Sequence, residues 1–326
     1  MAPDMTETSQ PVLAIFGPTA SGKSAVAEAV ADRIPVEIVS ADSMQVYRGL
    51  PILTNEPARP TRLVAIWELD HDASVGEYAE LAHQAVDEAL TEGITPLVVG
   101  GTGLYLRAAL VDLDLPPAPR LDARLLFEEL YDSLGPEQAH ALLVERDPRA
   151  AENVHANDRK RVVRALELAD AGESLARSPS RLWTHETRHP TLVFGLDVSK
   201  EVLAARIEVR VRAMFEQGVE EEVGRAAAGS LSRTATQVIG LREITELPRE
   251  EATAAIVRRT LRYAAYQRKW MRRIPGLVPL AADHAPANVA EALLAAARGR
   301  FPLLGQQEER LSGIRKGEAD HTGHTV

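Results

Sequence analysis

The chain has 326 residues and a formal net charge of −10, so it is long enough for a complete core plus a second lobe, and its total charge does not by itself attract a polyanion. It contains no cysteine, which excludes disulfides and thiolate metal sites and leads us to expect a cytoplasmic protein. It has neither an apolar run long enough to cross a membrane nor a signal-peptide pattern, so we expect no membrane association.

The first predicted elements are a strand over Val12–Phe16 and a helix over Lys23–Ile34, joined by GPTASGKS at residues 17–24. This loop has the form G-x-x-x-x-G-K-[ST], in which backbone N–H groups and a lysine hold phosphate and the final hydroxyl holds Mg²⁺. We therefore expect Lys23 to bind phosphate and Ser24 to bind Mg²⁺ as the cofactor. The loop alone does not separate ATP-binding kinases and other nucleotide-binding NTPases from transferases whose leaving group is diphosphate.

Two further predicted strands, Val36–Ser40 and Pro96–Gly100, are followed by residues of chemical interest. Asp42 follows the first strand, and its pattern fits a functional carboxylate or a helix cap. The sequence GGTG at 100–103 follows the second strand and fits a ligand-binding loop or a tight turn. Because the carboxyl ends of parallel strands meet at one edge of a sheet, these groups are expected near the phosphate loop.

The sequence changes character at the proline-rich linker LPPAP, residues 115–119. Helical periodicity then predicts helices over 121–134, up to Val144 and over 157–171, and strand character returns at Leu192–Leu196. This order predicts a helical insertion within one α/β domain. In the third of these helices the basic side chains share an edge that fits phosphate contacts or a solvated face.

Two basic patterns follow the insertion. Arg206 and Arg210 lie one helical turn apart, which suits a diphosphate, although ion pairs with Glu208 or Glu220 are the ordinary alternative. Residues 252–282 contain no acidic residue, so this segment is either a polyanion-binding surface or a solvated helix face. Its clustered basic residues are Arg258, Arg259, Arg262, Arg268, Lys269, Arg272 and Arg273.

The predicted fold is α/β, a doubly wound parallel sheet of the P-loop NTPase type with an inserted helical lobe. The predicted segments are a disordered N-terminus (1–10), the first part of the core (11–114), the insertion (115–185) and the second part of the core with basic helices (186–282). The last predicted segment (283–326) contains a helix over 287–298 and a disordered tail over 306–326.

Seven motifs in this order resemble the isopentenyl-tRNA transferase family, the tRNA dimethylallyltransferases. They are GPTASGKS (17–24), SADSMQVYRG (40–49), VVGGTGLYLRA (98–108), H-x-N-D-x-x-R-x-x-RALE (155–167), RI-x-x-RV-x-x-M-x-x-x-G-x-x-EEV (206–223), QVIGLRE (237–243) and Q-x-x-W (267–270). The chain departs from the usual family pattern at 53–57, 61–63 and 265–266. The resemblance implies transfer of a dimethylallyl group from dimethylallyl diphosphate to N6 of adenine 37 in the tRNA anticodon loop.

The resemblance also implies roles for individual residues. The predicted catalytic residues are Asp42, as the general base, with Thr19, Lys23, Arg206 and Arg210. The predicted diphosphate site is Gly17, Pro18, Thr19, Ala20, Ser21, Gly22, Lys23 and Ser24. The predicted tRNA-binding residues are Asp42, Ser43, Met44, Gln45, Thr102, Arg124, Lys160, Arg161, Val162, Val163, Arg164, Gln237, Val238, Ile239, Gly240, Leu241 and Arg242.

The expected partners are the tRNA anticodon stem-loop and dimethylallyl diphosphate, and we expect a monomer. Three other functions remain open at this point: a prenyltransferase acting on free adenine nucleotides, a P-loop small-molecule kinase, and an RNA-binding module with an inactive site.

Overall fold

The computed structural model describes residues 10–117, 121–176, 181–305 and 307. The segments predicted to be disordered, 1–9 and most of 306–326, lie outside the described residues. Among those described, no helix is both long and apolar enough to cross a bilayer.

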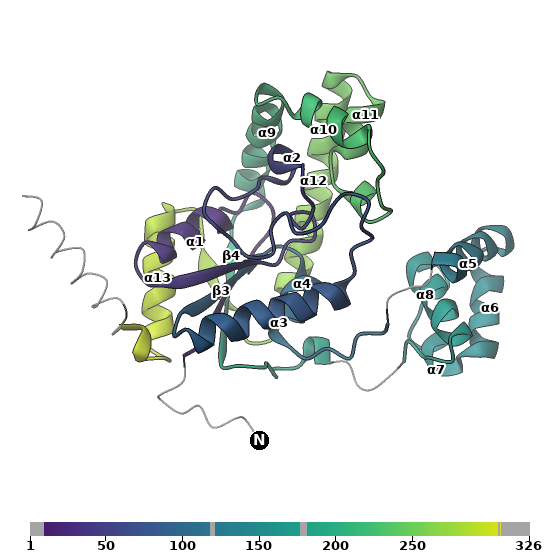
Figure 1. Cartoon of the computed structure of the whole chain (residues 1–326), viewed down its shortest axis with the longest axis horizontal. Helices are drawn as coiled ribbons and strands as arrows, with labels where there is room; N and C mark the ends of the chain where they lie inside the picture. Colours follow the sequence, from purple (N-terminus) through teal and green to yellow (C-terminus); the bar gives the residue numbers. More distant parts are fainter. Residues whose placement is uncertain (1–9, 118–120, 177–180, 306, 308–326) are drawn as a thin grey trace, which may run out of the picture. The chain divides into compact units, whose positions relative to one another are not determined.

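Five parallel strands form one sheet in the order β2-β3-β1-β4-β5 (Figure 1). They are β1 (Val12–Phe16), β2 (Val36–Ser40), β3 (Thr95–Gly100), β4 (Thr191–Asp197) and β5 (Val278–Ala281). All residues of β1 and β3 are buried, as expected for strands covered on both faces. The chain leaves the central β1 for β2 at the edge, returns through β3 and then crosses to β4, so the winding reverses at β1. In such sheets ligands bind beyond the carboxyl ends of the strands at the reversal.

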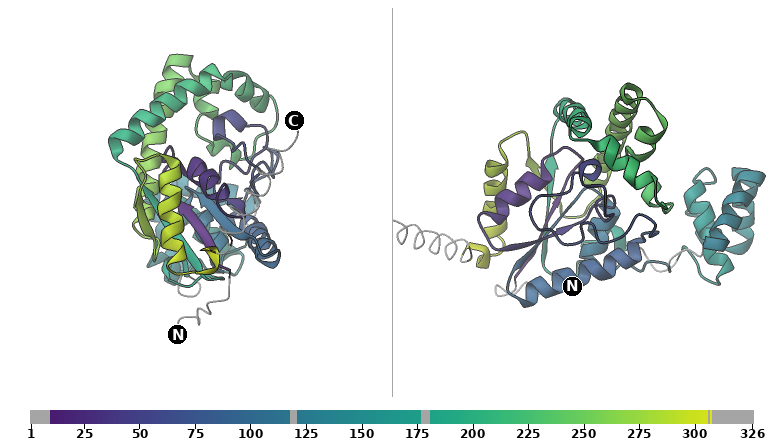
Figure 2. Two further views of the ribbon diagram at one scale, coloured as in Figure 1. Left: turned by 90° about the vertical axis from the view of Figure 1, so that its left-hand side faces the viewer. Right: turned by 45° about the horizontal axis from the view of Figure 1, so that its top comes forward.

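Helices cover both faces of the sheet (Figures 1 and 2). On one face, α1 (Lys23–Ala31) and α13 (Pro286–Arg298) pack on alternate strand residues such as Ile15, Leu97 and Phe194. On the other face lie α3 (Val75–Thr91) and α4 (Gly103–Leu110). The predicted fold class is confirmed by this arrangement.

Five further helices of the same unit gather beyond the carboxyl ends of the strands (Figure 1). They are α2 (Pro51–Thr54), α9 (Lys200–Glu216), α10 (Val219–Ala227), α11 (Leu241–Glu246) and α12 (Arg249–Met271). Two short 3₁₀ turns are also present, η1 (Arg181–Trp183) and η2 (Ala235–Gln237). The buried carboxylate of Glu222 on α10 accepts the N–H groups of Ile52 (2.9 Å) and Leu53 (2.8 Å), which holds α2 in place.

Residues 113–182 form a second compact unit. The insertion predicted from the sequence covers nearly the same residues, 115–185. It contains α5 (Leu121–Leu134), α6 (Pro136–Arg146), α7 (Pro148–Ala151) and α8 (Arg159–Asp170). Phe127, Leu143, Val162 and Leu166 belong to a hydrophobic core of its own. We call this unit the helical lobe.

Candidate functional site

The phosphate loop between β1 and α1 is shaped by two left-handed residues, Ala20 (φ 63°) and Gly22 (φ 91°). Lys23 opens α1, and its Nζ donates to the carbonyl oxygens of Gly17 (3.0 Å) and Pro18 (2.9 Å). Burial lowers the pKa of Lys23 to about 8, while nearby Asp42 opposes this shift and Arg210 adds to it. Lys23 is therefore a cation close to its titration point at neutral pH.

Two arginines of α9 face this loop, as their spacing predicts. Arg210 Nη1 donates to Thr19 Oγ1 (3.3 Å), and Arg206 Nη1 lies 3.5 Å from the carbonyl oxygen of Ala20. Among the described residues, Arg210 Nε is buried without a hydrogen-bond partner. Glu220, the alternative ion-pair partner, instead pairs with Arg249 at 3.5 Å. The geometry favours an anion-binding role for the arginine pair because a buried, unpartnered guanidinium N–H can bind an anion.

Asp42 follows β2, stabilises a turn through its side chain and lines the cavity beside it. Its Oδ1 accepts the N–H of Met44 (3.0 Å), but no helix begins here, so the carboxylate closes a turn instead of capping a helix. The neighbouring Ser43 N–H donates to Thr102 Oγ1 (3.2 Å), which is also 3.2 Å from the hydroxyl of Tyr263. The Asp42 turn and the loop after β3 therefore form one hydrogen-bonded unit.

The glycines of the loop after β3 are required by close packing. A Cβ at Gly100 would lie 2.1 Å from the carbonyl oxygen of Ala41, and one at Gly103 would lie 2.2 Å from Trp270. These glycines therefore make room for neighbouring segments of the protein, and neither has a positive φ. The polar group that this loop contributes near Asp42 is the hydroxyl of Thr102.

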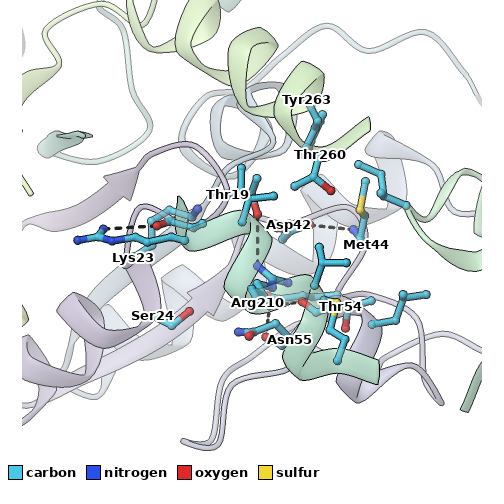
Figure 3. A pocket seen from close by; sticks show the side chains of 18 of the residues that line it. Thr19, Lys23, Ser24, Asp42, Met44, Thr54, Asn55, Arg210, Thr260 and Tyr263 are labelled. Carbon is cyan, nitrogen blue, oxygen red and sulfur yellow. Dashed lines mark hydrogen bonds between the residues drawn. The ribbon is translucent and has the colours of Figure 1, made fainter. Parts of the chain in front are cut away.

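These elements surround a cavity of about 430 Å³ (Figure 3). Thr19, Asp42 and Arg210 lie around it in the close view, with Lys23 and Ser24 beside them. Apolar side chains from α2, α9, α12 and the loop before α11 complete the wall: Leu53, Ile207, Val211, Met214, Ile239 and Ile256. The cavity thus combines a cationic phosphate loop, a carboxylate and a hydrocarbon surface.

Sequence reasoning missed most of the wall supplied by α2 and α12, including Thr54, Asn55, Thr260 and Tyr263. Burial raises the pKa of Tyr263, with a further contribution from Asp42, so its phenol stays protonated. The one signal for these residues in the sequence is that Tyr263 and Gln267 lie one helical turn apart. They lie within a segment whose basic residues predict a polyanion-binding surface.

The predicted tRNA-binding segment 237–242 runs from the end of η2 into the first turn of α11. Gln237 is exposed and Ile239 lines the cavity, but the side chains of Val238 and Leu241 are buried. Gly240 has a φ of 103°, and a Cβ there would lie 2.5 Å from Leu53 Cδ1. Arg259 of α12 secures the segment by donating to the carbonyl oxygen of Gln237 (3.0 Å).

Three other predicted tRNA-binding residues, Met44, Gln45 and Arg242, lie either at the cavity or in an ion pair. Met44 and Gln45 line the cavity, and Gln45 Nε2 donates to the carbonyl oxygen of Asn55 (3.0 Å). Arg242 is paired with Glu246 of its own helix at 3.1 Å.

In the helical lobe, the side chains of four predicted tRNA-binding residues have structural roles instead. Val162 and Val163 are buried in the core of the lobe, so their side chains do not face an RNA. Arg124 (3.1 Å) and Arg164 (2.9 Å) pair with Glu167, a buried carboxylate. These two arginines therefore stabilise the lobe because they compensate a buried charge.

The basic side chains of α8 that are classed as exposed are those of Lys160 and Arg161. The Arg161 side chain is 67% exposed, and its Nε lies 3.6 Å from Asp158. In the basic segment 252–282, Arg268 pairs with Asp197 (3.4 Å), and the exposed Arg273 stacks on Trp183 at 3.8 Å. The other exposed basic side chains of this segment are Arg258, Arg262, Lys269 and Arg272.

Comparison with known proteins identifies the family. The IPP transferase family matches residues 45–274, and the isopentenyl transferase family matches residues 10–62. The tRNA dimethylallyltransferase of Streptomyces coelicolor is 39% identical over 279 residues, covering 81% of this chain and 88% of the relative. That of Thermobifida fusca is 38% identical over 285 residues, with the same coverage of each chain.

Solved structures agree with the sequence relatives. A eukaryotic dimethylallyltransferase acting on tRNA has a TM-score of 0.74 at 25% identity, over 89% of this chain and 79% of that one. The full-length tRNA isopentenylpyrophosphate transferase from Bacillus halodurans has a TM-score of 0.65 at 28% identity, over 92% and 100%. The chain therefore belongs to the IPP transferase family.

Proposed function

We propose that this protein transfers a dimethylallyl group from dimethylallyl diphosphate to N6 of adenosine 37 in the anticodon loop of tRNA and releases diphosphate. The observation that carries the proposal is the cavity in which Lys23, Arg206 and Arg210 adjoin both an apolar wall and Asp42. A branched hydrocarbon joined to a diphosphate matches these surfaces, whereas the polar acceptor of a small-molecule kinase has no use for the apolar wall.

In this reaction the bond between the allylic carbon and the diphosphate oxygen breaks, so negative charge gathers on the leaving group. The N–H groups of the phosphate loop, the Lys23 ammonium and the two guanidinium groups of α9 stabilise that charge where it develops. Thr19 lies between these cations, and its hydroxyl accepts from Arg210.

The acceptor amine of adenine is weakly nucleophilic because its lone pair is delocalised into the ring. In the proposed reaction Asp42 orients the N6–H group by accepting a hydrogen bond and takes the proton as the new C–N bond forms. Adenine in a stacked loop is out of reach, so the base has to be flipped into the cavity. Tyr263 and Thr102 are the other polar groups beside Asp42 that can position it.

Mg²⁺ is part of the proposal. Among the described residues, no cluster of three His, Cys, Asp or Glu side chains forms a protein cage for a metal. Ser24 lines the cavity beside Lys23, and a hydroxyl together with substrate phosphate oxygens and water is a donor set that suits Mg²⁺. When bound, the ion would add positive charge at the diphosphate.

We assign tRNA contacts to Lys160 and Arg161 of the helical lobe, to the exposed side chains of Gln237 and Arg242, and to the exposed basic side chains of residues 258–273. With tRNA as the proposed acceptor, we place the enzyme in the cytoplasm.

The test runs three assays in parallel with Mg²⁺: transfer of label from dimethylallyl diphosphate to total tRNA, transfer of the same label to AMP, and transfer of a labelled γ-phosphate from ATP to a mixture of small alcohols. We expect label in tRNA at adenosine 37 only. Label in AMP instead would show a nucleotide prenyltransferase, and phosphorylation of a small alcohol would show a kinase.

A further inference from the structure

Gln267 is a buried polar side chain of α12 with an exposed fraction of 2%. Its Oε1 accepts the N–H of Thr19 (2.8 Å), and its Nε2 donates to the carbonyl oxygen of Gly101 (2.9 Å). The orientation of the amide is dictated by its partners, because a backbone N–H only donates and a carbonyl oxygen only accepts.

The two groups bridged by this amide belong to different parts of the cavity. Thr19 belongs to the phosphate loop, where Arg210 contacts its hydroxyl. Gly101 precedes Thr102, whose hydroxyl contacts Ser43 in the turn that begins at Asp42. One side chain thus connects the loop for the leaving group with the loops that hold the proposed proton acceptor.

The bridge is built tightly. A Cβ at Gly101 would lie 2.3 Å from Gln267 Nε2, so only glycine allows this approach. One turn further along α12, Trp270 packs over Gly103 and lies 4.8 Å from Trp183, ring centre to ring centre. One turn before the amide, the hydroxyl of Tyr263 lies 3.2 Å from Thr102 Oγ1, so α12 is anchored on both sides of Gln267 and the amide has little freedom to move.

We propose that Gln267 is a positioning residue that sets the separation between the diphosphate-binding loop and the Asp42 turn. This inference rests on the proposed function. Attack on the allylic carbon needs the amine and the leaving group held in line, and a misplacement of about 1 Å can cost about 10²-fold in rate. The pairing of Phe16 with Gly100 brings the two loops together at the strand ends, and the amide bridge fixes their separation beyond that point.

The decisive variant is Gln267→Glu, which keeps the shape and the acceptor for Thr19 but turns a carboxylate oxygen toward the carbonyl oxygen of Gly101. We expect kcat at pH 8 to fall about 10²-fold, with Kd for dimethylallyl diphosphate and for tRNA changed less than threefold. The ratio of variant to wild-type kcat should rise as the pH is lowered, because a protonated carboxyl can again donate to Gly101. Gln267→Met removes both hydrogen bonds and should lose kcat equally at every pH.

Gln84→Glu, an exposed position on α3 with the same change of charge, is the matched control and should behave as wild type. Transfer by the wild type to tRNA tests the proposed function separately. If the wild type is active and both Gln267 variants turn over normally, the inference is wrong. It is also overturned if the loss lies in the affinity for one substrate only, or in thermal stability with kcat per folded molecule unchanged.

Discussion

The low pKa of Lys23 predicts that the binding of dimethylallyl diphosphate depends on pH between pH 7 and pH 9. With a pKa of about 8, roughly nine-tenths of Lys23 is charged at pH 7 and about one-tenth at pH 9. Diphosphate binds the charged form, and its own oxygens are ionised throughout this range because a terminal phosphate has a pKa of about 6. Affinity for dimethylallyl diphosphate should therefore fall about tenfold from pH 7 to pH 9, or about 1.4 kcal/mol.

The sign can be checked independently by proton uptake. Bound diphosphate raises the pKa of Lys23, so binding at pH 9 should take up about nine-tenths of a proton and binding at pH 7 about one-tenth. Titration calorimetry in two buffers of different ionisation enthalpy measures both affinity and uptake. Burial raises the pKa values of Tyr105 and Tyr263, so the phenols of the site do not ionise in this range.

Lys23→Arg is the matched control for this prediction. Arginine stays charged, so the variant should bind the donor with little dependence on pH between 7 and 9. A wild-type affinity that is flat over this range, or a slope that persists in Lys23→Arg, would refute the assignment of this titration to Lys23.

Three further predictions test other parts of the site. Asp42→Asn keeps the acceptor for the Met44 N–H and should preserve binding of both substrates while lowering kcat about 10²-fold or more, as measured by single-turnover transfer; normal turnover would reduce Asp42 to a turn residue. Lys160→Glu with Arg161→Glu should flatten the salt dependence of tRNA binding by about 0.7 to 0.9 log–log units per lost phosphate contact, without changing donor affinity; an unchanged slope would make this a solvated helix face. Replacing residues 113–182 with a short Gly/Ser linker should leave a core that binds dimethylallyl diphosphate but no longer modifies tRNA, because the lobe has its own hydrophobic core; modification at the intact rate would remove the lobe from tRNA recognition.

The sheet and the phosphate loop were predictable because their signals are local. A buried parallel strand is a continuous apolar run, and the predicted bounds of β1 and β2 match the structure. The loop after β1 is defined by glycines and a lysine at set spacing. The edge strand β5 was missed because it is short, half-buried and contains Pro279, which weakens every local strand signal.

The helical lobe was predictable for the same reason, but the roles of its charged residues were not. Spacing along α8 shows that Lys160, Arg161 and Arg164 share an edge and that Glu167 lies one turn after Arg164. It does not show that Glu167 is buried and also pairs with Arg124 of α5. Whether an arginine faces solvent or compensates a buried carboxylate depends on residues from another helix.

What the sequence by itself determined is therefore the fold class, the phosphate loop, the carboxylate after β2 and the family resemblance, all of which depend on short-range patterns. Only the tertiary structure decided how the cavity is closed. Because α12 packs across the carboxyl end of the sheet, Gln267 reaches the phosphate loop at Thr19 and Tyr263 reaches Thr102. The physical reason is that a hydrogen bond between distant segments leaves no periodicity or composition in the sequence around either partner, since it depends on the path of the whole chain between them.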